Sequence, residues 1–142
     1  MTTPAPPAAE PAWISTRACA PRRRRVLLAD TDQPTLSVMG HRLGRAGFAV
    51  ATERTGPDAL AAVLKAPPDV VVAASRLPGL DGLCPFEQLC DELAEPPPVV
   101  LVFWPGNAAA VATALDAGVA DVIVRPLSLV EAVARIRRFA RA

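Results

Sequence analysis

The side chains of this chain that could do chemistry are few and widely spaced. His41 is the only histidine, and two of the three cysteines, Cys84 and Cys90, lie six residues apart with no CxxC pair. We therefore expect no zinc site, because such sites need several closely spaced Cys or His ligands. His41 lies off the apolar stripe of its segment, so we expect a solvated helix residue rather than a catalytic base.

Asp30 and Arg125 are better placed to act together. Asp30 ends the apolar run 26–30, and Arg125 follows the run 121–124. If both runs are parallel strands of one sheet, their carboxyl ends meet at the same edge, where ligands bind in such folds. We expect Asp30 and Arg125 to form an ion pair there. The alternative is that Asp30 is simply exposed at the end of its strand.

Apolar periodicity indicates the elements that position these residues. Short apolar runs predict strands at 26–30, 48–52, 70–74, 99–103 and 121–124. Helical spacing predicts helices near 34–47, 57–65, 84–93, 108–117 and 128–140, with Asp32 and Ser128 as helix N-caps. Strands that alternate with helices predict an α/β fold, a flavodoxin-like doubly wound five-stranded parallel sheet.

Composition narrows the classes of protein and partner. A chain of 142 residues with 51% hydrophobic residues predicts one packed domain. Residues 1–24, which are rich in Pro, Ala and Arg, are expected to form a disordered tail before a domain at 25–142. The net charge of +1 predicts neither nucleic-acid nor membrane binding, and we expect the run Arg22–Arg25 to be a solvated flank. With no leader and no apolar run of 18 residues visible, we expect a cytoplasmic protein with free thiols.

The segment 68–82 carries a family resemblance. It reads as a buried strand ending at Ala74, followed by the turn Pro78-Gly79. This pattern resembles the centre of the receiver domain of bacterial two-component response regulators, and the resemblance extends over roughly residues 25–141. In that family an aspartate four residues before the Pro-Gly turn accepts a phosphoryl group. Here that position is Ala74.

The resemblance also assigns the other positions of the phosphorylation site. In receivers, two adjacent acids after the first strand hold Mg²⁺, and here they are Asp30 and Thr31. A hydroxyl residue after the fourth strand is replaced by Phe103, and the lysine after the fifth strand by Arg125. The aromatic switch residue is replaced by Val122. The resemblance therefore implies a degenerate receiver, or pseudo-receiver, with no bound metal, no cofactor and no enzymatic activity.

The two aromatic residues after the fourth strand give further expectations. We expect the Phe103 ring to pack over Ala74, where it would fill the space of the missing carboxylate and lock one conformation. Trp104 either folds over this apolar pocket or stays exposed as an anchor for a partner or ligand.

The function expected from the resemblance is that of a phosphorylation-independent protein-interaction module in signal transduction. A protein partner, or a second copy forming a homodimer, would bind the face made by the helix at 108–117, the strand at 121–124 and the helix at 128–140. The alternative is that the alanines of the helix at 108–117 simply pack on the sheet. Two other functions stay open: a regulatory domain of a longer transcription factor, and a small-molecule sensor that uses the altered pocket.

Overall fold

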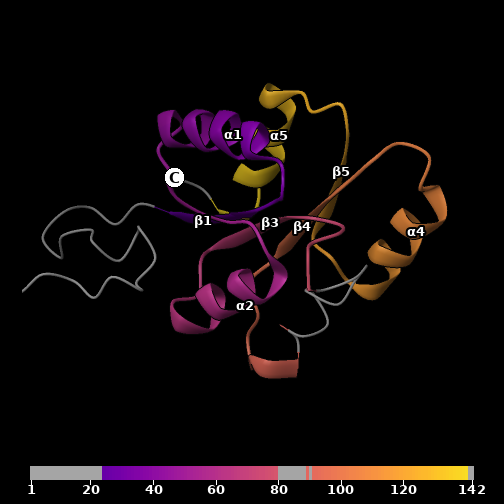
Figure 1. Cartoon of the computed structure of the whole chain (residues 1–142), viewed down its shortest axis with the longest axis horizontal. Helices are drawn as coiled ribbons and strands as arrows, with labels where there is room; N and C mark the ends of the chain where they lie inside the picture. The colour runs from indigo at the N-terminus through magenta and orange to yellow at the C-terminus, as the bar shows by residue number, and fades with distance from the viewer. Residues whose placement is uncertain (1–23, 80–88, 90, 141–142) are drawn as a thin grey trace, which may run out of the picture.

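The computed structural model describes residues 24–79, 89 and 91–140. Five parallel strands form one sheet in the order β2-β1-β3-β4-β5 (Figure 1). Their bounds are β1 Arg25–Ala29, β2 Ala49–Glu53, β3 Val70–Ala74, β4 Val99–Phe103 and β5 Asp121–Val124. This is the predicted flavodoxin-like sheet, in which the strand order changes direction between β1 and β3.

The described helices cover both faces of the sheet. The helices α1 (Gln33–Arg45) and α5 (Leu129–Arg137) lie on one face, and α2 (Gly56–Lys65) and α4 (Ala108–Ala117) lie on the other (Figure 1). Successive strand residues alternate between two hydrophobic clusters: Val100 and Val102 pack with α1 and α5, whereas Leu101 and Phe103 pack with α2. This two-sided burial explains why the strands are apolar without alternation in the sequence.

Polar caps fix where the helices begin. The Asp32 side chain accepts a hydrogen bond from the Thr35 amide at 3.2 Å, and the Ser128 hydroxyl accepts one from the Glu131 amide at 3.4 Å. Both predicted N-caps are therefore confirmed. At the other end, α4 stops at Gly118, which has a φ of 102° that only glycine adopts easily.

Several predicted boundaries are wrong by one or more residues. The strand β1 ends at Ala29, so Asp30 follows the strand instead of ending it. Phe48 is buried ahead of β2, which runs to Glu53. The helix α5 ends at Arg137. Of the helix predicted at 84–93, Leu89 and residues 91–92 are helical, while Cys84 and Cys90 lie outside the described residues.

Most of α4 is exposed. Only Ala114 of this helix is buried, whereas Leu115 on α4 and Val124 on β5 are 48% and 47% exposed. The idea that the alanines of α4 simply pack on the sheet is therefore wrong for most of them. Within the described ranges, no helix combines the length and apolar character that crossing a membrane requires.

Candidate functional site

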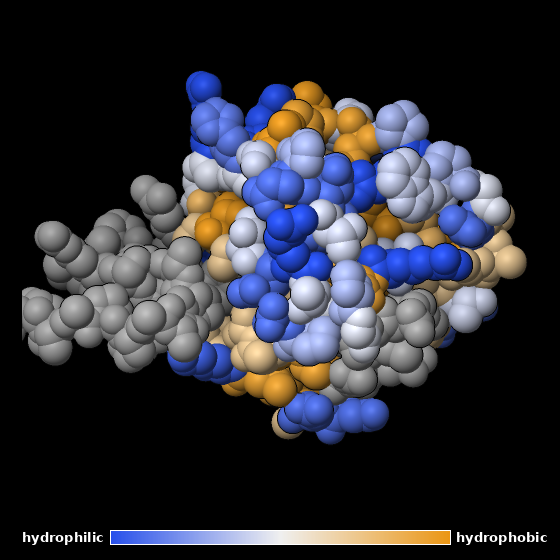
Figure 2. Space-filling model, in the orientation of Figure 1, coloured by the Kyte–Doolittle hydropathy of each residue, from blue (hydrophilic) through white to orange (hydrophobic). Residues whose placement is uncertain are grey.

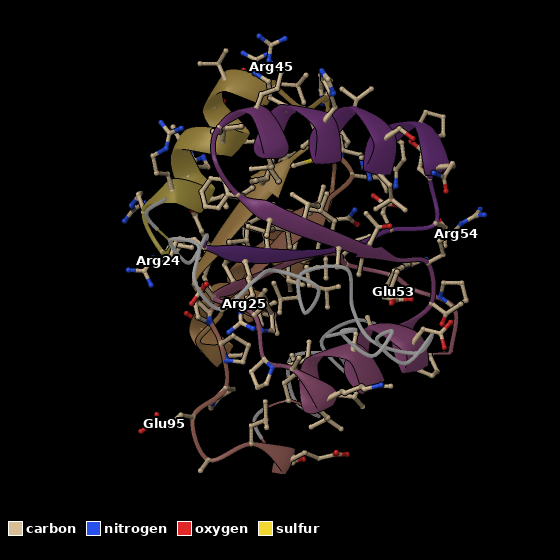
Figure 3. The ribbon with its side chains drawn as sticks, turned by 90° about the vertical axis from the view of Figure 1, so that its left-hand side faces the viewer. Arg24, Arg25, Arg45, Glu53, Arg54 and Glu95 are labelled. Carbon is tan, nitrogen blue, oxygen red and sulfur yellow. The ribbon has the colours of Figure 1, made fainter. Side chains whose placement is uncertain are left out.

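The residues singled out in the sequence gather at the carboxyl edge of the sheet. Asp30 follows β1, Ala74 ends β3, Phe103 ends β4 and Arg125 follows β5. Figure 3 shows the two edges: Arg24 and Arg25 mark the amino end of β1, and Glu53 and Arg54 lie at the opposite edge. The parallel strands therefore bring residues that lie far apart in the sequence to one place, as the fold predicts.

Asp30 and Arg125 form the predicted ion pair. The Arg125 Nη2 atom donates to Asp30 Oδ2, and each side chain is only 10% exposed. The second carboxylate oxygen, Oδ1, accepts the Asp32 backbone N–H at 3.0 Å. Arg125 Nη1 also donates to the Thr35 hydroxyl of α1 at 3.3 Å. Because the carboxylate is buried, this pairing supplies the counter-charge that burial requires.

Thr31 and Asp32 have local structural contacts. The Thr31 backbone carbonyl accepts a hydrogen bond from Arg54 Nη2 at 3.2 Å. The Asp32 carboxylate is occupied by the Thr35 amide and hydroxyl, so it caps α1. Asp32 therefore does not supply a second free carboxylate beside Asp30.

Ala74 lies beside a very small cavity. This cavity has a volume of about 10 Å³, and Asp30, Thr35, Met39 and Val102 are among its lining residues. A space of this size holds at most one water molecule. Ala74 itself is partly buried at the end of β3, and the space beside its methyl group is too small for a bound ion with its ligands.

Phe103 is buried in the hydrophobic cluster against which the partly buried Ala74 also packs. Ala74 pairs with Val102, so these two side chains share a face of the sheet, and Phe103 points to the other face. Phe103 is only 5% exposed and belongs to the cluster on the α2 face, and it does not line the cavity beside Ala74. Val122, which is partly buried, packs against the same cluster as Phe103.

Trp104 is exposed and lies against Arg125. The indole is 65% exposed, and its ring centroid is 4.7 Å from Arg125 Cζ, a cation–π distance. Trp104 also lines a hollow of about 440 Å³ with residues of α1 and of the segment after β5, among them Val38 and Leu127. Of the two roles left open for Trp104, exposure beside this hollow favours that of an anchor.

Glu53 is an acid of this edge that the sequence reasoning missed. Burial raises the pKa of its carboxyl above the ordinary value of 4.5, and the charge of Asp58 raises it further. The backbone carbonyl of Glu53 also accepts the Asp30 N–H at 3.2 Å. The signal available in the sequence for including Glu53 in the site was an acidic residue at the end of a strand next to β1.

The residues present do not fit a magnesium ion. Mg²⁺ requires several hard oxygen ligands in octahedral array. Among the described residues, the carboxylate that lies beside Ala74 is that of Asp30, and it is bonded by Arg125 and by a backbone N–H. In the part of the chain that the structure describes, no three His, Cys, Asp or Glu residues are grouped closely enough to hold a metal.

Comparison with known proteins defines the family. The sequence model of the response regulator receiver domain matches residues 26–137, and the chain belongs to this family of two-component signalling proteins. The chain is 31% identical over 121 residues to a probable transcriptional regulator ycf27 of Guillardia theta. It is 32% identical over 117 residues to the transcriptional regulatory protein PrrA of Mycobacterium tuberculosis. These matches cover 84% and 82% of the chain but only 46% and 50% of the two relatives.

Solved structures agree with the fold. The receiver domain of the Francisella response regulator 1452 superimposes with a TM-score of 0.76 at 22% sequence identity, covering 82% of this chain and 95% of that chain. At this identity the likeness concerns the fold. The chain spans about half the length of the curated relatives it matches.

Proposed function

We propose that this chain is a pseudo-receiver, a receiver that regulates through protein contacts without being phosphorylated on aspartate. The observation that carries the proposal is the Asp30–Arg125 pair beside Ala74. In receivers the metal and the acceptor aspartate neutralise and accept the phosphoryl group. Here Arg125 occupies the remaining carboxylate, and a methyl group stands at the acceptor position. This site therefore offers neither an aspartate that could accept the phosphoryl group nor a free carboxylate for the metal ion that would neutralise it.

The test is intact-mass measurement after incubation with acetyl phosphate and Mg²⁺. We expect no increase in mass, whereas a receiver that keeps its aspartate, treated in parallel, gains one phosphoryl group. A stable phosphoryl group on any aspartate of this chain would refute the proposal. The Asp30→Asn variant, treated in the same way, shows whether any signal comes from this site.

The partner surface that fits this role is the face made by α4, β5 and α5. The exposed alanines of α4 permit close approach of another surface, and Leu115 and Val124 supply apolar side chains that are about half exposed. Light scattering across a concentration series tests whether a second copy binds there. If Val124→Glu makes a dimer monomeric while Val38→Glu does not, the face is assigned. A monomer at every concentration leaves the partner role to a different protein.

A small-molecule sensor is the second candidate, and the hollow beside Trp104 favours it. Its volume of about 440 Å³ falls in the range of ligand pockets, and its lining is mainly apolar. Trp104 fluorescence reports binding once the only other tryptophan is removed by Trp13→Phe. Saturable quenching by a metabolite, lost in Val38→Glu, would support the sensor.

The likeness to transcriptional regulators gives a third candidate, a regulatory domain of a transcription factor. It is supported by the similarity to two transcriptional regulators and by the fact that the chain spans about half the length of each. Fusion or co-purification of a DNA-binding partner, followed by a promoter-binding assay with and without this chain, tests that role.

A further inference from the structure

A groove between α1 and α5 lies outside the site described above. Its hollow measures about 670 Å³ and lies beside the carboxyl-terminal half of α1. The residues that line it include His41, Arg42 and Arg45 from α1 and Val130, Ala134 and Arg137 from α5. Figure 3 shows Arg45 at the end of α1 that lies beside α5, pointing away from the sheet.

The positive charges of this groove are not neutralised within the described residues. None of the three arginines that line it makes an ion pair with a described residue, and α1 contains no acidic residue. The other charged residues of α5 are already used: Arg135 pairs with both Glu131 and Asp121 at 3.0 Å. The three arginines of the groove are therefore neither buried nor paired with an acidic residue among the described residues.

Apolar side chains accompany the positive charges. Val130 is 68% exposed, and Val133 and Ala134 contribute to the lining of the groove. Towards the other end of α1, Val38 is 50% exposed and borders the apolar hollow that Pro34 and Leu129 also line. In Figure 2, hydrophobic atoms are visible along the upper edge, where Figure 1 places α1 and α5. The seam between the two helices thus carries apolar side chains along its length and positive charges beside the carboxyl-terminal half of α1.

We infer that this seam binds an acidic amphipathic helix of a partner protein. Such a helix presents an apolar stripe to Val38 and Val130 and carboxylates to Arg42, Arg45 and Arg137. Carboxylates pair with guanidinium groups through two parallel hydrogen bonds, and helices commonly dock through an apolar stripe in a groove. The 13 residues of α1 span about 20 Å, the length of a docked helix of about the same number of residues.

Two other anionic partners fit the seam less well. A nucleic-acid backbone offers phosphates but leaves the exposed valines without an apolar contact. A membrane surface is flat, whereas the arginines here line a hollow. The inference deepens the proposed role as an interaction module and rests on it, but it is tested separately, since peptide binding is measured without phosphodonor and phosphorylation without peptide.

The probe is a fluorescently labelled 15-residue peptide with Leu at helical spacing and Glu on the flanking positions. Fluorescence anisotropy with the full chain compares it with a scrambled peptide of the same composition, a 15-base-pair DNA duplex and vesicles of phosphatidylglycerol. We expect saturable binding of the amphipathic peptide, at least tenfold tighter than that of the scrambled one and weakened by salt. Absence of saturable binding, equal binding of the two peptides, or tighter binding of DNA or vesicles overturns the inference.

Charge-reversal variants locate the binding. Arg42→Glu with Arg137→Glu should weaken peptide binding at least tenfold. The matched control, Lys65→Glu with Arg76→Glu, makes the same change in net charge at two exposed positions outside the groove and should leave binding within about twofold of the parent. Val130→Ser should weaken the amphipathic peptide but not the scrambled one. Equal losses in both charge variants would show a general electrostatic effect and contradict the assignment.

Discussion

Replacement of Arg125 by Met should be strongly destabilising. Within the part of the chain that the structure describes, the change removes the one cation bonded to the Asp30 carboxylate, whose side chain is 10% exposed, and leaves it with one backbone N–H donor. Removing one partner of a buried ion pair costs about 3–5 kcal/mol, because the remaining charge is left uncompensated. For a domain of this size the midpoint of thermal unfolding should fall by about 10 °C or more.

The double variant distinguishes the ion pair from general packing. Asp30→Leu combined with Arg125→Met replaces both charges by apolar side chains. Such replacements of buried pairs are often neutral or stabilising, so the double variant should unfold within about 1 kcal/mol of the parent. Urea unfolding is measured for the parent, for Asp30→Leu, for Arg125→Met and for the double variant, which together form a double-mutant cycle. The expected coupling free energy between Asp30 and Arg125 is several kcal/mol.

Arg54→Met is the matched control for this prediction. Arg54 lies at the same edge of the sheet but is exposed, with one hydrogen bond to the Thr31 carbonyl at 3.2 Å. Its loss should change the free energy of unfolding by only about 0.5 kcal/mol. If Arg125→Met costs no more than Arg54→Met, the Asp30–Arg125 pair is screened by water, and the buried-pair account of this site is wrong.

Three further variants test the rest of the site. Ala74→Asp places a second carboxylate beside Asp30, next to a cavity of only about 10 Å³, and should cost about 1–3 kcal/mol in urea unfolding. Adding Mg²⁺ should not restore the stability, and recovery with Mg²⁺ would show that the site still holds a metal. Phe103→Ala should cost about 3–5 kcal/mol because the ring is buried, and a melting point within a degree of the parent would contradict its burial. Glu53→Gln should raise the melting temperature at pH 7, because a raised pKa in the folded state means that ionisation of Glu53 destabilises the fold as pH increases above 4.5. Below pH 4.5 the parent and Glu53→Gln should melt alike, and an advantage that persists there would exclude the carboxylate charge as its cause.

The sheet and its caps could be predicted because their signals are local. Strands covered on both faces are continuously apolar, so 70–74 and 99–103 were found with the bounds that the structure gives. The caps Asp32 and Ser128 depend on a side chain within three residues of its partner. The Asp30–Arg125 pair could also be predicted, because a parallel sheet brings the carboxyl ends of its strands together whatever their separation in sequence.

The face of the sheet on which the Phe103 ring lies could not be predicted, because it depends on the register of β3 and β4. The sequence shows that Ala74 and Phe103 both end strands, but not which residues of β3 and β4 lie opposite each other. The pairing of Ala74 with Val102 leaves Phe103 one residue further along, and one residue moves a side chain to the other face of the sheet. The cavity beside Ala74 is therefore lined by Val102 and residues of α1, whereas Phe103 belongs to the cluster on the α2 face, against which Ala74 also packs.

Arginine at position 125 has a consequence that lysine would not have. Its guanidinium donates to Asp30 from one nitrogen and to Thr35 from another. The centroid of the Trp104 ring lies 4.7 Å from the guanidinium carbon, Cζ. A lysine ammonium is a single point charge and cannot match this planar arrangement. Through these contacts Arg125, which follows β5, holds together the residue after β1, the first turn of α1 and the residue after β4. Movement of the segments after β1 and β5 relative to each other would therefore first have to break this buried pair, at the cost that the Arg125→Met variant measures.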